Sequence, residues 1–240
     1  MLSVQKLSQI AKKSQTSLVN VARDYTQALF LSFFYQQKEA LDFLFKGGTA
    51  FHFVYQSPRY SEDLDFSALV SGCRSFEDVL AKTLAALEKT GLKTELVESK
   101  PTTGGCLVIF SVLIEELLIK IQLEISLRTP KKAKGEMTLV RTPFLPPFNI
   151  QIIEERALVT GKIDALLSRK KPRDFYDLYF LIRSDLKVEL TNEQRQAISR
   201  AIGKLDARQL DKELKEFLPR SHRLIIKDLP SALKKELERA

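Results

Sequence analysis

Two short stretches of this chain decide its fold, Lys46–Thr49 (KGGT) and Arg59–Phe66 (RYSEDLDF). The apolar run Phe43–Phe45 leads directly into the glycine pair of the first stretch, which predicts a strand that ends in a tight turn. A short helix is expected to follow over Thr49–Tyr55. In the second stretch polar and apolar residues alternate, which predicts another strand over Asp63–Ser67.

Each stretch also carries a chemical signal. Gly47 and Gly48 would let a phosphate approach the backbone, and the free N–H groups at the start of the following helix could bind it. Asp63 and Asp65 would point to the same side of their strand, where a divalent cation could bridge them. Alone, a glycine pair is commonly a plain turn, and alternating aspartates are commonly a polar strand face. Their order and spacing make the combination more specific than either part.

Further elements are predicted on both sides of this unit. Helices are expected over residues 17–40 and 75–90, the second capped by Ser75 and ended by Gly91. Strands are expected around residues 93–97, 107–114 and 117–127. The last one alternates strictly, with apolar residues at every second position and Lys120, Gln122 and Glu124 on the opposite face. Glu124 can therefore join the aspartates if the two strands are neighbours.

A run of prolines predicts a boundary between two lobes. Pro143, Pro146 and Pro147 interrupt the pattern, so we expect a core lobe over residues 1–135 and a helical lobe over residues 148–240. Helices are expected over residues 152–169, 173–183, 191–202, 207–218 and 232–238, with a capping box formed by Thr191 and Gln194. The fold class is thus α/β (α+β), with a small mixed sheet flanked by helices and a C-terminal helical lobe.

Composition narrows the class of protein. The chain has 240 residues with 38 Lys and Arg against 30 Asp and Glu, a net charge of +8. This charge suits a polyanionic partner such as RNA or a nucleoside triphosphate, although a solvated basic surface explains it equally well. No apolar run is long enough to span a bilayer, so we expect a cytoplasmic protein without a membrane partner.

The cysteines and histidines predict no metal or triad chemistry. Cys73 and Cys106 are too few to form a disulfide framework, and they are not spaced like metal ligands. We therefore expect each to be a small buried side chain, in a protein of a reducing compartment. The chain has only two histidines, His52 and His222, which argues against a histidine-based zinc site or a Ser-His-Asp triad.

The glycine pair followed by the Asp-x-Asp strand resembles the signature of the polymerase-β nucleotidyltransferases. More narrowly, the chain resembles the AbiEii/AbiGii toxin family, the nucleotidyltransferase-like toxins of bacterial abortive-infection and toxin–antitoxin systems. Three further segments match motifs of that family in order: Lys120–Glu124 (KIQLE) with K-I-x-x-E, Lys162–Arg169 (KIDALLSR) with K-x-x-A-x-x-x-R, and Arg173–Leu178 (RDFYDL) with R-D-x-x-D-L. One small departure is the second glycine, where some relatives carry serine.

This resemblance implies roles for particular residues. It implies that Asp63, Asp65 and Glu124 bind Mg²⁺, with Mn²⁺ as an alternative, and that Glu124 accepts the proton of the attacking hydroxyl. Lys162 and Asp177 complete the catalytic set. The residues expected to bind the nucleotide are Gly47, Gly48, Thr49, Ser61, Lys162, Arg169, Arg173 and Asp174.

Elementary geometry supports part of this assignment. Lys162 and Arg169 are two helical turns apart, so they share a helix face and could clamp a triphosphate, although a solvated basic edge is the commoner explanation. Asp174 and Asp177 lie one helical turn apart, and both could orient Lys162, Arg169 or the acceptor. A carboxylate at the start of a helix also explains Asp174, so Asp177, further in, is the better functional candidate. Tyr176 and Tyr179 could stack on a base, but core packing is more usual.

The activity implied is transfer of a nucleoside monophosphate from an NTP to an acceptor hydroxyl, with release of pyrophosphate. The protein would be a toxin encoded with a cognate antitoxin, and its acceptor would be RNA, with the tRNA 3′ end as the leading candidate. Basic residues that could bind such an acceptor are Arg128, Lys131, Lys132 and Lys134. Two alternatives remain, a nucleotidyltransferase that modifies a small molecule or a protein, and an inactive relative that only binds nucleic acid.

Overall fold

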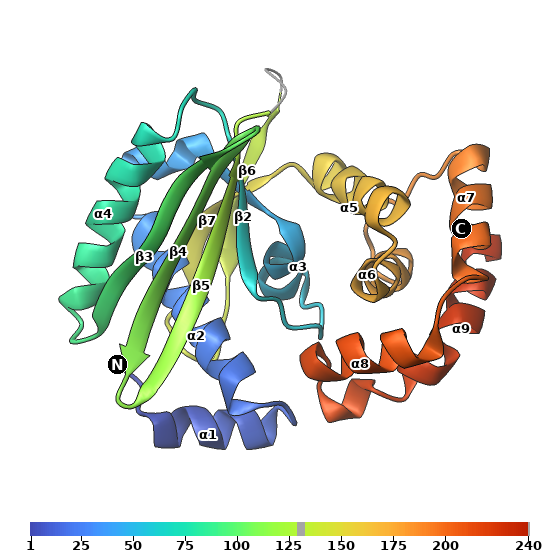
Figure 1. Ribbon diagram of the computed structural model, residues 1–240, viewed down its shortest axis with the longest axis horizontal. Coiled ribbons are helices and arrows are strands. Elements are labelled where there is room, and N and C mark those ends of the chain that lie inside the picture. Colours follow the sequence, from blue (N-terminus) through green and yellow to red (C-terminus); the bar gives the residue numbers. More distant parts are fainter. Residues whose placement is uncertain (129–132, 240) are drawn as a thin grey trace. The chain divides into compact units, whose positions relative to one another are not determined.

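The computed structural model describes residues 1–128 and 133–239, and the chain forms two compact units (Figure 1). The first unit comprises Met1–Gln56 and Tyr60–Glu154, and the second comprises Ser57–Arg59 and the chain from Glu155 onward. Lys131 and Lys132, expected to bind RNA, lie outside the described residues.

The first unit is built on a seven-stranded mixed sheet in the order β3-β4-β5-β2-β1-β7-β6. The β2–β5 and β1–β7 pairs are parallel, and the others are antiparallel. The mixed α/β fold predicted from the sequence is thereby confirmed. The strands are β1 (Phe43–Lys46), β2 (Asp63–Ala68), β3 (Lys93–Thr102), β4 (Gly105–Ile114), β5 (Leu117–Ser126), β6 (Gly135–Val140) and β7 (Phe148–Ile153).

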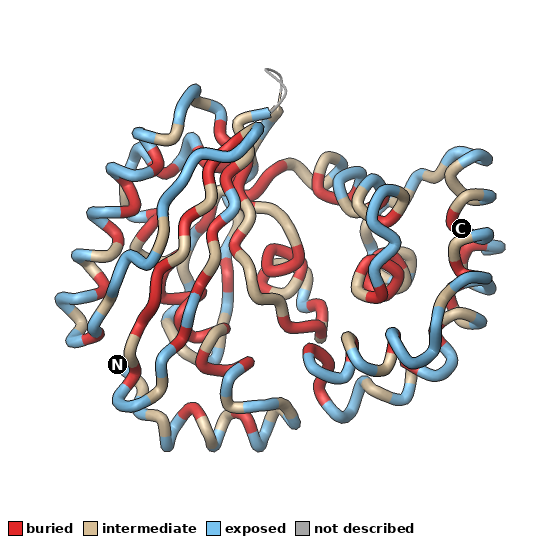
Figure 2. Tube along the Cα trace, in the orientation of Figure 1, coloured by how far each residue is buried: buried red, intermediate tan, exposed pale blue. Residues whose placement is uncertain are grey.

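Helices of the first unit cover the apolar face of this sheet. Phe30 and Phe34 extend from α2 onto Phe110 of β4 and Phe66 of β2, and Phe76 of α4 joins them, with ring centroids 5.2–5.8 Å apart. Figure 2 shows the resulting bands of buried residues along the central strands. The helices are α1 (Val4–Lys13), α2 (Leu18–Phe34), α3 (Gly47–Tyr55) and α4 (Arg74–Glu88), with a 3₁₀ turn over Lys38–Asp42.

The alternation predicted for β5 matches the observed burial. Ile119, Ile121, Leu123 and Ile125 are buried on one face, whereas Glu124 is exposed on the other. The predicted condition for Glu124 also holds, because β2 and β5 are neighbours. The expected cap of α4 is not found, since this helix begins at Arg74 and its N-cap is Cys73 without a side-chain hydrogen bond.

Strands β6 and β7 differ from the prediction. Residues 135–153 form an antiparallel pair at the edge of the sheet, and β7 lies beside β1 with Ile150 and Ile152 buried. The expectation that the chain is helical from residue 152 is therefore wrong, because α5 begins only at Glu155. The proline run connects two strands of the sheet. The first unit ends at Glu154, and the helical unit continues from Glu155.

The second unit is helical. It contains α5 (Glu155–Arg169), α6 (Pro172–Arg183), α7 (Asn192–Ile202), α8 (Ala207–Phe217) and α9 (Ile225–Arg239), with a 3₁₀ turn over Arg220–His222. Their apolar faces meet in one core that includes Leu178, Ile198, Leu214 and Leu229. The capping box predicted at the start of α7 is confirmed, because Thr191 and Gln194 exchange side-chain to backbone hydrogen bonds.

The two cysteines correct another expectation. Cys73 and Cys106 form a disulfide with their Cα atoms 6.0 Å apart, which ties the residue before α4 to the beginning of β4. The pair was expected to be two separate buried thiols. Within the described part of the chain, no helix is long and apolar enough to cross a membrane.

Candidate active site

Charged side chains form a row across three neighbouring strands. Lys46 of β1 lies opposite Asp65 of β2, and Asp65 lies opposite Glu124 of β5. Residues directly opposite each other on paired strands project from the same face, so these side chains are neighbours. Asp63 lies opposite Gln122 and belongs to the same face, because it is two positions from Asp65.

This row opens into a cavity of about 500 Å³ in the first unit. Lys46, Asp65 and Glu124 line one part of it. The tip of the β3–β4 hairpin and Arg128 line another, and Arg128 is fixed there because its Nη2 donates to the Thr103 carbonyl at 2.9 Å. Gln122 Nε2 donates to Glu124 Oε1 at 2.8 Å, which orients the Glu124 carboxylate.

Lys46 is a site residue to which the sequence analysis gave no role. Burial lowers the pKa of its ammonium group, and the negative charges of Asp65 and Glu124 act in the opposite direction. The ammonium group therefore partly balances carboxylates that would otherwise repel each other. The only signal in the sequence was its place, immediately before the glycine pair.

The glycine turn fits closely against the aspartate strand. Gly47 has φ +82°, and a side chain there would collide with the Asp65 carboxylate. Gly48 and Thr49 follow at the start of α3, and the buried Thr49 hydroxyl donates to the Asp63 carbonyl at 2.5 Å. Ser61, just before β2, accepts a hydrogen bond from Gln27 through its carbonyl at 3.2 Å. These contacts fix the turn and the beginning of β2 relative to each other.

The carboxylates have the chemistry of a magnesium site. Carboxylate oxygens are the hard ligands that Mg²⁺ prefers, and the register of β2 and β5 makes Asp65 and Glu124 direct neighbours. Among the described residues, however, no three His, Cys, Asp or Glu side chains are close enough together to hold a metal ion. The assignment of Asp63, Asp65 and Glu124 as the complete ligand set stays a prediction.

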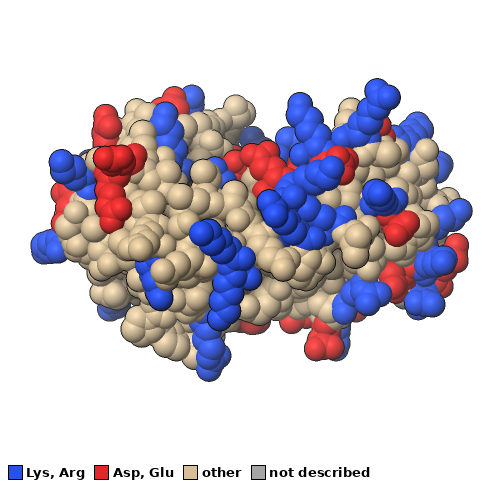
Figure 3. Space-filling view, turned by 90° about the horizontal axis from the view of Figure 1, so that it is seen from below, with Lys and Arg blue, Asp and Glu red and all other residues tan. Residues whose placement is uncertain are grey.

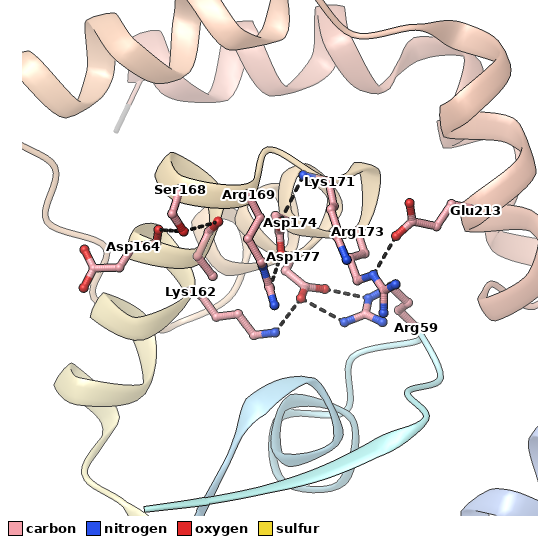
Figure 4. Close-up of polar contacts among 11 residues, drawn as sticks. Arg59, Lys162, Asp164, Ser168, Arg169, Lys171, Arg173, Asp174, Asp177 and Glu213 are labelled. Atoms are coloured by element: carbon pink, nitrogen blue, oxygen red, sulfur yellow. Dashed lines mark hydrogen bonds and ion pairs between the residues drawn. The ribbon is translucent and has the colours of Figure 1, made fainter. Parts of the chain in front are cut away.

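The helical unit contains a buried ion cluster centred on Asp177 (Figure 4). Arg59 binds both carboxylate oxygens of Asp177, at 2.7 Å from Nε and 2.9 Å from Nη2, and Lys162 Nζ lies 2.8 Å from Oδ2. Burial by itself would raise the pKa of Asp177, but the charges of Arg59 and Lys162 lower it to about 2. Asp177 is therefore ionised at neutral pH and holds both cations in place.

Asp174, one turn earlier on α6, makes a separate set of polar contacts. Its Oδ1 accepts from Arg169 Nη2 at 2.6 Å, and its Oδ2 accepts from the Lys171 backbone N–H at 3.1 Å (Figure 4). Asp174 thus caps the helix and also orients Arg169, whose side chain remains 49% exposed. Arg173 points elsewhere and pairs with Glu213 at 2.6 Å.

These contacts bear on the sequence-based assignments. Asp174 and Asp177 were both expected to be able to orient Lys162 or Arg169, and in the structure Asp177 binds Lys162 while Asp174 binds Arg169. The alternative explanation of Lys162 as part of a solvated basic edge does not fit, because only 11% of its side chain is exposed and it reaches into the cluster. Arg59 received no role, although it opens the RYSEDLDF stretch, because its partner lies 118 positions further along the chain.

Comparison with known proteins identifies the family. The family model described as nucleotidyl transferase AbiEii toxin of type IV toxin–antitoxin systems matches residues 29–239. The chain belongs to the AbiEii family. It is accordingly a nucleotidyltransferase, and the family predicted from the motifs is confirmed. Membership implies an NTP substrate and an antitoxin partner.

Solved structures show the same fold at low sequence identity. MenT4, a nucleotidyltransferase toxin from Mycobacterium tuberculosis, is 17% identical with a TM-score of 0.67, over 99% of this chain and 89% of MenT4. JHP933 from Helicobacter pylori is 17% identical with a TM-score of 0.59, over 93% and 95% of the two chains. A search of curated proteins found no match.

Proposed function

We propose that this AbiEii protein is a metal-dependent cytoplasmic toxin that transfers a nucleoside monophosphate from an NTP to a hydroxyl group of RNA. The tRNA 3′ end is the first candidate acceptor. The main support is the row of Lys46, Asp65 and Glu124, which lines a cavity beside the glycine turn. This arrangement combines carboxylates for a metal with a backbone that a phosphate can approach.

The proposed metal ligands are Asp63, Asp65 and Glu124, with Mg²⁺ as the ion and Mn²⁺ as an alternative. A divalent cation bound there would stabilise negative charge on the attacking and leaving oxygens. Lys46 places its side-chain amino group in the same row, where the charges of Asp65 and Glu124 favour its protonated form. The chain therefore supplies both the ligands and part of the charge balance that phosphoryl transfer needs.

The remaining steps use groups of the chain itself. We propose that Glu124 accepts the proton of the attacking hydroxyl. The hydroxyl oxygen then forms a bond to the α-phosphorus, and the bond from that phosphorus to the pyrophosphate oxygen breaks. The backbone at Gly47 and Gly48, at the start of α3, would bind the phosphates. Thr49 is fully buried, so we assign it to positioning Asp63, and Ser61 stays a candidate phosphate contact.

The helical unit is proposed to contribute cations. Lys162 and Arg169 would bind phosphate oxygens while Asp177 and Asp174 hold them in position. Arg173 completes the proposed nucleotide-binding set. The guanidinium of Arg169 is already held by a carboxylate, so its orientation is set before the substrate binds. It therefore loses little further conformational entropy on binding.

The acceptor is inferred from charge. Lys and Arg side chains are distributed over the face seen in Figure 3, and the chain carries a net charge of +8. Arg128 and Lys134 are exposed, and Arg128 also lines the active-site cavity. An RNA bound by these residues would release counterions, so its affinity should fall by about 0.7 to 0.9 log units per log unit of salt for each phosphate contacted.

One experiment tests the reaction and the acceptor together. The protein is incubated with each α-labelled NTP and total RNA, with and without Mg²⁺, and Asp65→Asn serves as the inactive control. We expect label in an RNA band only for the wild type with metal. Label that enters a protein or a small molecule would replace RNA as the acceptor, and label that enters RNA without any divalent cation would contradict the metal dependence.

A further inference from the structure

A second cavity, of about 440 Å³, lies wholly within the helical unit. It is formed by the second half of α6 together with the segment that precedes α9, and Pro58 contributes to its wall. A cavity of this size falls in the range of small-ligand sites. None of the residues proposed above for catalysis, metal binding or nucleotide binding lines it.

The walls of this cavity are aromatic. Tyr176 and Tyr179 lie one turn apart on α6 with ring centroids 6.5 Å apart, and Phe180 lines the cavity beside them. Tyr176 is buried, whereas Tyr179 and Phe180 are only half-buried and present part of their rings. Aromatic rings of this kind stack on nucleobases without regard to sequence, because every base has a π face.

A guanidinium and a polar rim complete the cavity. The Arg183 guanidinium carbon lies 5.4 Å from the centre of the Tyr179 ring, and Glu236 fixes this guanidinium through a contact of 2.8 Å. Ser221 Oγ and His222 Nδ1, 3.0 Å apart and both exposed, supply hydrogen-bonding groups at the rim. No Asp or Glu belongs to the lining among the described residues. The cavity therefore combines stacking surfaces with polar groups suited to a base edge.

The cavity adjoins the ion cluster described above. Pro58 directly precedes Arg59, and Tyr176 directly precedes Asp177, so two residues of the wall are continuous with the Arg59–Asp177 pair. A nucleotide whose base entered the cavity would have its phosphate near positively charged groups, since Lys162 belongs to the same cluster.

We propose that this aromatic cavity binds a nucleobase, and that the base belongs to a single-stranded segment of the acceptor RNA. The second part rests on the proposed function. Stacking between the Tyr179 ring and the base, flanked by Arg183, would hold the acceptor strand independently of the metal site. The same chemistry would suit the base of an NTP, so the test separates the two sources.

The absence of tryptophan from the sequence allows a direct binding measurement. Tyr179→Trp places the only tryptophan of the chain in the cavity, where it can be excited apart from the tyrosines, and a stacked base quenches it. The titration is done in an Asp65→Asn background, where no transfer is expected, with a short single-stranded RNA and separately with each NTP. We expect saturable quenching by RNA at concentrations where NTPs have little effect. Tyr55→Trp, in the first unit, is the control and should respond weakly.

Substitution of two comparable arginines tests the role of the cavity in RNA binding without changing its tyrosines. Arg183 and Arg239 both pair with Glu236 and both are exposed, but only Arg183 lines the cavity. RNA affinity should fall for Arg183→Ala and stay near the wild-type value for Arg239→Ala. Tyr179→Ala should bind RNA roughly five- to a hundredfold more weakly, in line with the loss of one stacked base.

The outcomes separate this proposal from the proposed function. Quenching of the Tyr179→Trp, Asp65→Asn protein by RNA, together with no nucleotide transfer to RNA by the wild type, would support the cavity and remove RNA as the acceptor. Unchanged RNA affinity in Tyr179→Ala and Arg183→Ala, with transfer to RNA intact, would overturn the cavity and leave the proposed function standing. Stronger quenching by an NTP than by RNA would overturn the assignment to the acceptor. No quenching by either would exclude a nucleobase site, as expected for a surface that binds protein.

Discussion

The carboxylate of Asp65 lies against the α-carbon of Gly47, in the space that a side chain at Gly47 would occupy. Gly47 also has φ +82°, a conformation that L-residues with side chains rarely adopt. Two independent constraints therefore require glycine at this position. One is a property of the backbone, and the other is the position of a proposed metal ligand.

These constraints can be separated by a pair of substitutions. Gly47→Ala and Gly91→Ala both place a methyl group at a positive φ, with a strain of about 1–2 kcal/mol each. Nothing lies within 4 Å of a side chain at Gly91, whereas one at Gly47 would displace Asp65. We expect a loss of thermal stability in both variants, larger in Gly47→Ala because of the collision with Asp65, and loss of nucleotide transfer only in Gly47→Ala. Normal transfer by Gly47→Ala would show that the position of Asp65 is not needed.

Asp65→Asn should uncouple metal binding from folding. In the wild type, Mg²⁺ with NTP should raise the melting temperature, because a ligand that binds only the folded state stabilises it. The variant should lose most of this rise and all transfer. Without ligands, the melting temperature of Asp65→Asn should change little, because the negative charge of Glu124 still interacts with Lys46. Asp78→Asn, on the exposed side of α4, is the control. A variant that kept the full rise would contradict the ligand assignment.

The pKa of Asp177 predicts a specific loss of stability in acid. Its folded-state pKa of about 2 lies below the ordinary value of 3.8, so the group stabilises the fold above pH 3.8 and loses this effect as the pH falls toward 2. Asp177→Asn should lower the unfolding free energy at pH 7 by about 3–5 kcal/mol, because it leaves Arg59 and Lys162 buried without their counterion. Urea titrations should show the difference shrinking between pH 4 and pH 2. A constant difference would argue against an ionised Asp177, and the exposed Asp185→Asn provides the control.

The disulfide makes the protein sensitive to reductant. The bond between Cys73 and Cys106 closes a loop with a sequence separation of 33, for which a stabilisation of about 3–4 kcal/mol is expected. Dithiothreitol should lower the urea midpoint of the wild type to that of Cys73→Ser and should leave this variant unchanged. A wild type that does not respond would show that the thiols are already reduced. Disulfides are rare in reducing compartments, so the measurement also bears on the proposed cytoplasmic location.

The features that could be predicted from the sequence are local ones. The glycine turn, the Asp63–Asp65 alternation and the polar face of β5 each depend on residues a few positions apart, and periodicity reveals them. The position of Glu124 opposite Asp65 could only be stated as a condition, because strand order is not a local property. The edge strands β6 and β7 were missed since the prolines between them resemble a linker.

The features that could not be predicted depend on distant pairs. The partner of Arg59 lies 118 positions away, and nothing near Arg59 distinguishes it from an ordinary surface arginine. The cysteines are 33 positions apart, and only the fold brings their sulfur atoms together. Lys46 was visible in the motif, but its role depends on the register of β1 with β2.

The short segment Ser57–Arg59 belongs to the helical unit although it is encoded between α3 and β2 of the other unit. The helical unit is therefore not a contiguous cassette that recombination could exchange as a single piece. A chimera of two relatives joined after Glu154 would combine Asp177 from one parent with Arg59 from the other. To keep this buried pair from one parent, the codons for Ser57–Arg59 and those for the chain from Glu155 onward have to be inherited together.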